Sequence, residues 1–178
     1  MNYSELFNSL HPDFFKDKSI RSLPKEWIFT ELVMDLRVDL PQATASHCPS
    51  KITFGEYHGD LAVLHDVVRK VDEGWVQYFN KGCRFYCAFD GEMIVSFCII
   101  DDMGCFQGLH IGGPGCVGTI PEYRRQGIGL EMVRLATEIM RQEGFDISWI
   151  HYTHLANWYM KLGYKPVLRW NCDGIFKE

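Results

Sequence analysis

The spacing of apolar residues predicts strands in some segments of the chain and helices in others. From Leu32 to Leu40 every even position is apolar and most odd positions carry a charge, which is typical of a strand with one buried face. Between Met93 and Ile100 apolar residues occupy nearly all positions on both faces, so we expect a central strand covered on both sides. A helical stripe follows at Ile128, Met132, Leu135, Ala136 and Ile139.

Aspartate, glycine and proline residues mark the ends of the predicted elements. Asp60 stands where a helix N-cap is expected, Asp90-Gly91 accepts the positive φ angles of a hairpin turn, and Gly144 is placed to end the long helix. We expect short helices and loops over 1–26 and a glycine-rich loop before residue 116. The predicted strands are 32–40, 51–57, 83–89, 92–100, 116–120, 146–151 and one or two within 164–176; the predicted helical segments are 61–71, 75–79, 128 to just before Gly144, and 155–162, with a turn at 121–126.

The order of these elements predicts the fold class and a division of the chain. Strands and helices alternate in the second half after a hairpin in the first, which favours an α/β or α+β fold with a mixed sheet. The polar segment 42–50 is the best candidate for a linker, so we expect an N-terminal appendage, 1–50, and a main domain, 51–178. Three roles are open for the strand of the appendage: it could extend the sheet, cover a substrate site of the main domain, or pair across a homodimer.

Composition narrows the classes of partner. The chain has 178 residues, 47% of them hydrophobic, and a formal net charge of −5, which disfavours a broad electrostatic surface for nucleic acid or an anionic membrane. The first twenty residues contain no signal peptide and no apolar run is long enough to span a bilayer, so we expect a soluble, cytoplasmic protein. The seven cysteines include no CxxC pair; buried thiols in a reducing compartment are the favoured interpretation and a zinc site the minor one.

The segment from Val117 to Leu130 carries the strongest functional signal. A predicted strand runs into a turn with glycines at 127 and 129, and the long helix begins there. Free N–H groups and the positive end of the helix dipole favour a phosphate or pyrophosphate at such a helix start, and Arg124 and Arg125 add positive charge. A tight turn without a ligand is the alternative interpretation of this Gly-x-Gly pattern.

This segment resembles the acetyl-CoA-binding signature of the GNAT acetyltransferase superfamily, Arg/Gln-x-x-Gly-x-Gly/Ala after a strand and a Pro-Glu turn. Arg124, Gly127 and Gly129 occupy its defining positions. Residues 156–164 resemble the family's Ala-x-x-Tyr-x-Lys-x-Gly-aromatic segment, and residues 90–95 resemble the hairpin that precedes the CoA-binding strand. The resemblance covers about residues 51–178 and does not extend to residues 1–50.

The resemblance implies a mixed, mostly antiparallel sheet of six or seven strands, flanked by helices and splayed between the CoA-binding strand, which ends at Ile120, and the strand that ends near His151. It implies acetyl-CoA as cofactor, CoA as product, and direct transfer of the acetyl group to a small-molecule amine or an exposed peptide amine. The pantetheine arm would pair with Val117 and Thr119, and the pyrophosphate would lie on the turn at 124–130. The implied cofactor-binding residues are Val117, Gly118, Thr119, Arg124, Arg125, Gln126, Gly127, Ile128, Gly129, Leu130 and Asn157.

The resemblance also implies a proton donor and leaves the proton acceptor open. Tyr159 matches the tyrosine that protonates the departing thiolate, and a phenol is protonated at neutral pH; packing of the helix on the sheet is the alternative role. One departure is Thr153, where many family members have asparagine. The glutamate that some members carry on the CoA-binding strand falls on Gly113 here, so the candidates for the base are His110, His151, His154, Asp101, Asp102 and a water chain to solvent.

Two readings of other classes compete with an N-acetyltransferase. The missing carboxylate at Gly113 motivates a GNAT-shaped, CoA-binding regulator or interaction module without catalysis. Residues 113–118 fit Gly-x-Gly-x-x-Gly, but no helix is expected directly after them, which disfavours a dinucleotide-dependent oxidoreductase. His151 and His154 have no evident third ligand, so no metal site is predicted, and the motifs of serine hydrolases and of P-loop proteins are absent from the sequence.

Overall fold

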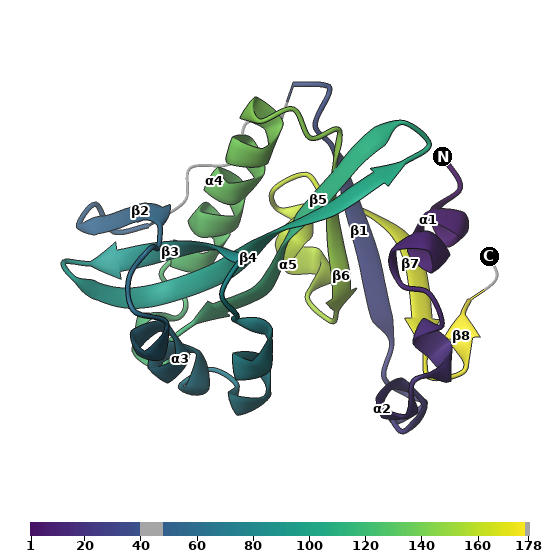
Figure 1. The fold of residues 1–178 in the computed structure, drawn as a ribbon, viewed down its shortest axis with the longest axis horizontal. Helices are drawn as coiled ribbons and strands as arrows, with labels where there is room; N and C mark the ends of the chain where they lie inside the picture. Colours follow the sequence, from purple (N-terminus) through teal and green to yellow (C-terminus); the bar gives the residue numbers. More distant parts are fainter. Residues whose placement is uncertain (40–47, 177–178) are drawn as a thin grey trace.

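Eight strands form one mixed sheet, twisted across the whole molecule (Figure 1). The computed structural model describes residues 1–39 and 48–176. The order across the sheet is β2-β3-β4-β5-β6-β1-β7-β8, and each neighbouring pair is antiparallel except β5 with β6. The strands are β1 (Phe29–Asp35), β2 (Ile52–Glu56), β3 (Arg84–Asp90), β4 (Met93–Phe106), β5 (Leu109–Thr119), β6 (Ile147–Thr153), β7 (Lys165–Asn171) and β8 (Gly174–Ile175).

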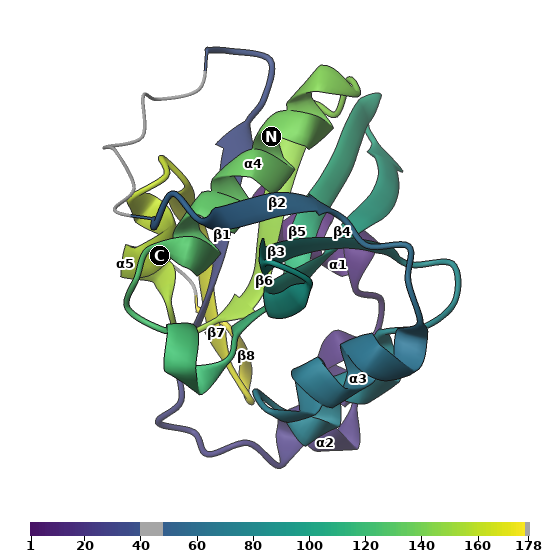
Figure 2. The same ribbon diagram turned by 90° about the vertical axis from the view of Figure 1, so that its left-hand side faces the viewer.

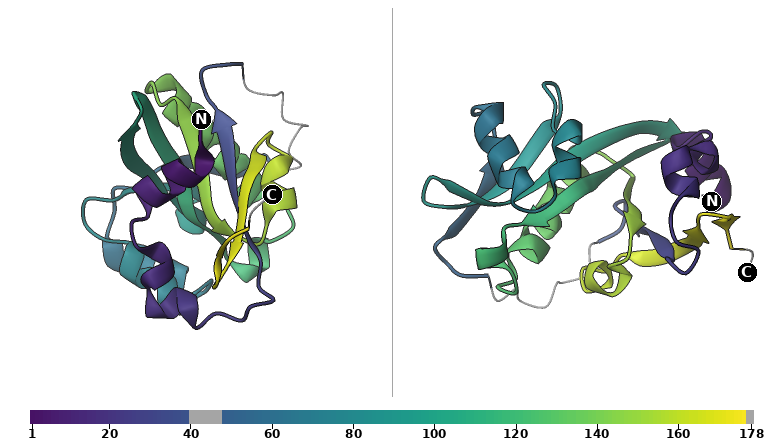
Figure 3. Two further views of the ribbon diagram at one scale, coloured as in Figure 1. Left: turned by 90° about the vertical axis from the view of Figure 1, so that its right-hand side faces the viewer. Right: turned by 90° about the horizontal axis from the view of Figure 1, so that it is seen from below.

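Helices cover both faces of the sheet (Figures 2 and 3). The long helix and the short α5 lie on one face, and α3 with the N-terminal helices lies on the other (Figure 3). The helical segments are α1 (Tyr3–Leu10), η1 (Phe14–Lys16), α2 (Lys18–Arg21), α3 (Leu61–Arg69), η2 (Glu73–Tyr78), η3 (Pro121–Tyr123), α4 (Ile128–Gln142) and α5 (Ala156–Met160). The mixed class and the mostly antiparallel sheet are confirmed, with eight strands instead of six or seven.

The predicted local signals hold at three element ends. The Asp60 side chain accepts a hydrogen bond from the Ala62 amide and caps α3, which ends at Arg69 rather than near residue 71. Gly91, in the turn between β3 and β4, has φ +61°, and Gly144, just beyond α4, has φ +86°. These ends were predictable because each depends on a residue's own conformational freedom or on a contact two residues away.

The prediction of a glycine-rich loop before residue 116 was wrong, because most of this segment belongs to β4 and β5. β4 and β5 continue as a hairpin to a turn at Gln107 and Gly108, both with positive φ (+51° and +79°). Glycines in β5 permit close approach: a Cβ at Gly113 would lie 2.0 Å from the carbonyl oxygen of Trp149 on β6. The absence of side chains therefore serves strand packing here, not a loop.

The N-terminal strand is an interior strand of the same sheet, so the structure shows the first of its three expected roles, extension of the sheet. β1 pairs with β6 on one side and with β7 on the other. The expectation of one exposed face was wrong: Glu31 is 0% and Val33 6% exposed, because helices cover both faces. The strand begins and ends earlier than predicted, and Leu40 lies outside the described residues. The boundary predicted at residue 50 does not mark a break in the sheet, and most of the predicted linker 42–50 also lies outside the described residues.

Three hydrophobic clusters hold these layers together. One packs α4 and α5 on the sheet, a second packs α3 and η2 on β2, β3 and β4, and a third packs the N-terminal helices on β1, β6 and β7. All seven cysteines are free; burial raises the pKa of the Cys87 thiol to about 12 and the pKa of Cys98 still further above its ordinary range. No helix within residues 1–39 and 48–176 combines the length and the apolarity that a membrane crossing requires.

Candidate active site at the parting of two strands

β5 and β6 separate soon after they meet. Over the described residues they pair only at Ile111 with Ile147 and at Gly112 with Ser148. Beyond these pairs, residues 113–119 of β5 continue beside β4 without a partner on β6. Cys116, with φ +47°, lies where the register with β4 shifts, so the backbone of β5 is irregular at this point. The separation predicted between these two strands is present.

A pocket of about 270 Å³ lies at this separation, on the side of α4 and α5. Both sequence motifs contribute to its walls, although they lie about 30 residues apart in the chain. The lining residues are Val117, Thr119, Tyr123, Arg124, Arg125, Gly129, Leu155, Trp158 and Tyr159. Tyr123, Leu155 and Trp158 were not predicted; the two aromatic residues stand within the motif segments, which is the signal that could have indicated them.

The turn before α4 has the backbone geometry of an anion site. Arg125 and the N-cap Gly127 both have positive φ (+63° and +74°), which turns the chain sharply into the helix. The first amides of a helix have no partner within it and lie at the positive end of its dipole. The Arg124 Nε donates to the Thr119 carbonyl oxygen at 2.9 Å and ties this turn to the end of β5.

Several of the predicted cofactor residues have packing roles. A Cβ at Gly129 would lie 2.9 Å from the Thr119 hydroxyl, and one at Gly118 would lie 2.4 Å from the Phe97 ring, so both glycines permit close packing. Ile128 is 1% exposed, and Leu130 packs against the cluster under α4. The side-chain Nε2 of Gln126 donates to the Glu122 carbonyl oxygen at 3.3 Å. Asn157 is exposed and is not among the residues that line the pocket.

Two buried tyrosines close to each other have different surroundings. Tyr159 is 7% exposed and lines the pocket, and its ring meets the Trp158 ring edge to face at 4.8 Å. Burial raises the pKa of Tyr159 well above its ordinary value, so the phenol keeps its proton across the working pH range. The Tyr164 hydroxyl, in contrast, is hydrogen-bonded to Thr137 and Ser148 inside the core.

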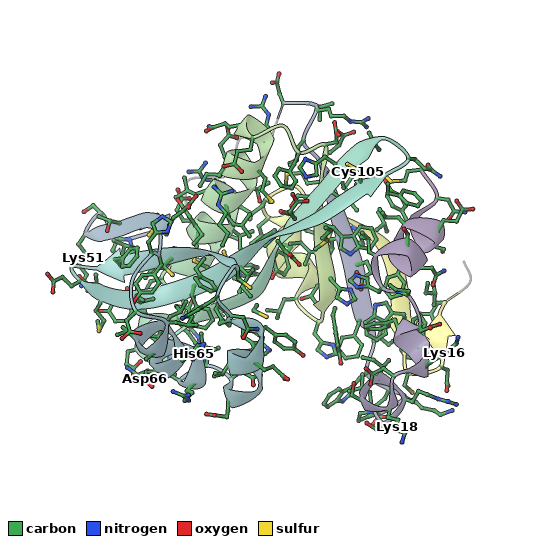
Figure 4. The ribbon with its side chains drawn as sticks, viewed as in Figure 1. Lys16, Lys18, Lys51, His65, Asp66 and Cys105 are labelled. Carbon is green, nitrogen blue, oxygen red and sulfur yellow. The ribbon has the colours of Figure 1, made fainter. Side chains whose placement is uncertain are left out.

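The structure does not bring His110 to the pocket. Its register partner on β4 is Cys105, near the tip of the β4–β5 hairpin. Figure 4 labels Cys105, which lies at the end of the hairpin far from α3. His110 lies seven positions before Val117 along β5, which corresponds to about 23 Å of strand. Its Nε2 lies 2.9 Å from Asp102 Oδ1, and its ring stacks on Phe145 at 3.8 Å.

Two other candidate bases lie elsewhere in the sheet, His154 just after β6 and Asp101 on β4. His154 Nδ1 is 3.0 Å from the Ile28 carbonyl oxygen, and its ring packs on Phe29, so it joins the end of β6 to the start of β1. Asp101 pairs with Gly113 across β4 and β5. Burial, and then the charge of Asp102, raise the pKa of Asp101. Asp101 is separated from β6 by β5.

His151 is held in a buried polar cluster that the sequence did not reveal. Its Nδ1 lies 2.9 Å from Oε2 of Glu31, a residue of β1 that is 0% exposed. Its ring stacks on His11 at 3.8 Å with an interplanar angle of 15°. Burial, and then the charge of His151, lower the pKa of His11 to about 4. In the part of the chain that the structure describes, no three His, Cys, Asp or Glu side chains gather in a way that could hold a metal ion.

One family model matches the central part of the chain. Residues 81–166 match the family model of the acetyltransferase (GNAT) domain, which extends from just before β3 into β7. This range contains both sequence motifs and the whole separation of β5 from β6. It does not contain β1, α1 or the short helices of the N-terminal segment. A search of curated proteins found no match.

Solved structures share the fold at low sequence identity. One is described as a unique GCN5-related glucosamine N-acetyltransferase region of a fungal multi-domain GH3 beta-N-acetylglucosaminidase; it is 19% identical, with a TM-score of 0.67, over 82% of this chain and 20% of that one. A GCN5-related N-acetyltransferase from Kribbella flavida is 17% identical, with a TM-score of 0.55, over 79% of this chain and 55% of that one. A Trypanosoma brucei acetyltransferase is 17% identical, with a TM-score of 0.53, over 64% of this chain and 92% of that one. The chain thus spans a fifth of the first of these proteins and about half of the second.

Proposed function

We propose that the protein is an N-acetyltransferase that passes the acetyl group of acetyl-CoA directly to an amine, because residues 81–166 match the family model of the GNAT acetyltransferase domain. The acceptor is a small-molecule amine or an exposed amino group of a peptide. One observation carries this proposal: β5 and β6 part at a pocket whose walls come from the Arg124–Gly129 turn and from the Tyr159 helix, so both predicted motifs meet in one place.

The residues present fit acetyl-CoA. The turn at Arg124, Arg125 and Gly127 leads into a helix start that suits the pyrophosphate, by charge and by the direction of its amides. The edge of β5 at Val117 and Thr119 has no partner on β6 among the described residues, so it suits the amide groups of the pantetheine arm. Asn157 is left out of this set because it lies outside the pocket lining.

The chemistry needs one proton donor and one proton acceptor from the chain. Bound acetyl-CoA would supply a thioester, from which the acetyl group passes to the amine as a C–N bond forms and the C–S bond breaks. Tyr159, protonated and in the pocket wall, donates its proton to the departing sulfur. His151, on β6 beyond its last pair with β5, accepts the proton that the amine loses.

Two measurements test the proposal in sequence. Calorimetric titration with acetyl-CoA should show binding at micromolar concentrations, and no heat change at high micromolar cofactor would contradict it. A thiol-reactive dye should then detect CoA release in the presence of an amine from a panel of glucosamine, a linear polyamine, an aromatic amine and a peptide with a free N-terminus. A heat-inactivated sample with each amine gives the background rate.

A second candidate function is a CoA-binding regulator without catalysis. It is favoured by Gly113, where the backbone of β6 lies so close that no side chain fits, so a carboxylate at this position is excluded on steric grounds. This candidate predicts the same acetyl-CoA binding but no CoA release with any amine of the panel. The thiol-release measurement therefore separates the two functions.

A further inference from the structure

The buried carboxylate of Glu31 is hydrogen-bonded to three groups on two strands. Its Oε1 accepts from the Trp170 Nε1–H at 2.7 Å and from the Tyr152 amide at 3.1 Å. Its Oε2 lies 2.9 Å from His151 Nδ1. Glu31 is 0% exposed, so β1, which lies between β6 and β7, places a buried carboxylate on one face of the sheet. A buried carboxylate of this kind needs partners that are fixed in position.

These contacts determine how the imidazole of His151 is protonated. An indole N–H and a backbone amide can only donate, so they engage Glu31 as an acceptor. The contact between Oε2 and Nδ1 holds one proton, and an ionised carboxylate accepts it from Nδ1. The neutral imidazole then carries its hydrogen on Nδ1 and its lone pair on Nε2. Nε2 is therefore the nitrogen that can accept a further proton.

The aromatic surroundings of His151 fix the plane of its ring. The His11 ring stacks on it at 3.8 Å, and the Phe14 ring meets it edge to face at 5.2 Å. Because burial lowers the pKa of His11 to about 4, this neighbour is neutral near pH 7 and adds no second positive charge. The His151 side chain remains 22% exposed, so the ring is fixed without being closed off from solvent.

The position of His151 relates this cluster to the pocket. His151 follows Ser148, the last residue of β6 that pairs with β5, and precedes Leu155, which lines the pocket. Its ring packs against Phe7, His11 and Phe14 of the N-terminal segment, whereas Tyr159 packs in the cluster under α4 and α5. The proposed proton acceptor and proton donor therefore approach the separated strands from opposite faces of the sheet.

We propose that Glu31 is a positioning residue for the acetyl transfer, and that it holds the His151 ring with Nε2 ready to take the proton of the acceptor amine. The inference rests on the proposed function and adds to it a residue from outside the matched range 81–166. When Nε2 takes the proton, the imidazole becomes an imidazolium, and the Glu31 carboxylate stabilises that charge through the Nδ1–H bond. The proton then leaves to solvent, and the ring returns to its neutral state.

The variant Glu31→Gln tests this role with little change of shape. The glutamine oxygen can still accept from Trp170 and Tyr152, but its NH₂ group must donate to His151 Nδ1, which moves the ring hydrogen to Nε2. We expect kcat to fall at least about 100-fold, the scale of a lost general base, while the KM for acetyl-CoA stays within about twofold because the cofactor contacts do not change. A kcat within about threefold of the wild type would overturn the proposal.

A matched control removes the carboxylate that contacts another histidine, His110. Asp102→Asn alters the His110–Asp102 contact, also 2.9 Å long, about 23 Å along β5 from the pocket. We expect this variant to keep the kcat of the wild type. An equal loss of kcat in both variants would also overturn the proposal, since it would show that the effect does not depend on His151.

A spectroscopic measurement on the unaltered protein does not depend on the folding of a variant. Nitrogen NMR of protein labelled at the histidine ring nitrogens, at slightly alkaline pH, reports which nitrogen of each ring carries the hydrogen. We expect His151, assigned with the variant His151→Gln, to carry it on Nδ1; a hydrogen on Nε2 would overturn the proposal. This result is independent of turnover: if no amine releases CoA, the proposed function fails, whereas a wrong tautomer in an active enzyme removes only the role of Glu31.

Discussion

Tyr159 and Tyr164 are both buried tyrosines, but Tyr159 lines the pocket whereas the Tyr164 hydroxyl is hydrogen-bonded inside the core. The variant Tyr159→Phe removes a hydroxyl from the pocket wall and should lower kcat by about 100-fold, because the leaving sulfur loses its proton donor. Affinity for acetyl-CoA should change little. Tyr164→Phe is the matched control: it removes hydrogen bonds to Thr137 and Ser148 and should cost about 1–3 kcal/mol of unfolding free energy with kcat retained. Steady-state thiol release and urea unfolding measure both effects, and equal kcat in the two variants would refute the assignment.

His11 should make the stability of the protein sensitive to acid. Its pKa is lowered from 6.5 to about 4 in the folded protein, so the unfolded chain binds a proton here more readily between these values. Stability is unaffected above about pH 6.5 and is lost as pH falls towards 4, by at most about 3 kcal/mol. The variant His11→Phe keeps an aromatic ring against His151 without the titration. Urea unfolding at several pH values should show a smaller acid loss for the variant than for the wild type; parallel curves would contradict the expectation.

At the scale of elements, two glycines of β5 allow a steric role of glycine to be distinguished from a purely conformational one. A Cβ at Gly113 would lie 2.0 Å from the Trp149 carbonyl oxygen, a backbone atom that cannot move away without disturbing β6. Gly113→Ala should therefore lower the unfolding free energy by about 3 kcal/mol, the upper range for overpacking. Gly115→Ala, two residues along the same strand, meets nothing within 4 Å and should change stability by less than about 0.5 kcal/mol. Urea unfolding of the two variants makes the comparison, and similar losses would show that strand conformation matters more than the contact.

The elements that the sequence predicted are those whose signals are local. The helix cap at Asp60 and the turn at Gly91 depend on residues within two positions of each other. The extension of the β4–β5 hairpin is not predictable in the same way, because a glycine such as Gly113 is explained by Trp149 of β6, more than 30 residues further along the chain. The sequence predicts one exposed face for β1 because charges alternate with apolar residues, whereas the charge of Glu31 is buried against three partners from β6 and β7. Such long-range contacts leave no periodic signal in one sequence.

The candidate site divides in the same way. The Arg124–Gly129 turn and the Tyr159 helix could be predicted because each is a short motif with its own spacing, and the structure places both at one pocket. Which of the candidate bases is favoured could not be predicted, because only the folded structure shows that His110 lies near the tip of a hairpin and that His151 contacts Glu31. A single histidine in a sequence carries no indication of its carboxylate partner.

At the scale of the whole molecule, the sheet consists of two parts joined by few strand contacts. β2 to β5 form one part, and β6, β1, β7 and β8 form the other; over the described residues the two parts share only the pairs Ile111–Ile147 and Gly112–Ser148. Helices α4 and α5 add side-chain packing under the junction. A ligand that lies between β5 and β6 would therefore contact both parts and oppose their separation.

This architecture predicts that acetyl-CoA stabilises the protein as a whole and protects β5 in particular. At a concentration 100 times its Kd, a ligand that binds only the folded state adds about 2.7 kcal/mol, which for a chain of this size raises Tm by about 5–10 °C. Hydrogen exchange should slow within residues 115–119, whose edge lacks a strand partner on β6, and should change little at residues 86–90 of β3, which pair on both sides. NAD, which shares the adenosine diphosphate but lacks the pantetheine arm, is the control and should protect β5 much less. A thermal shift without slower exchange on β5 would place the cofactor elsewhere, because a ligand between the strands must use the amides that they leave unpaired.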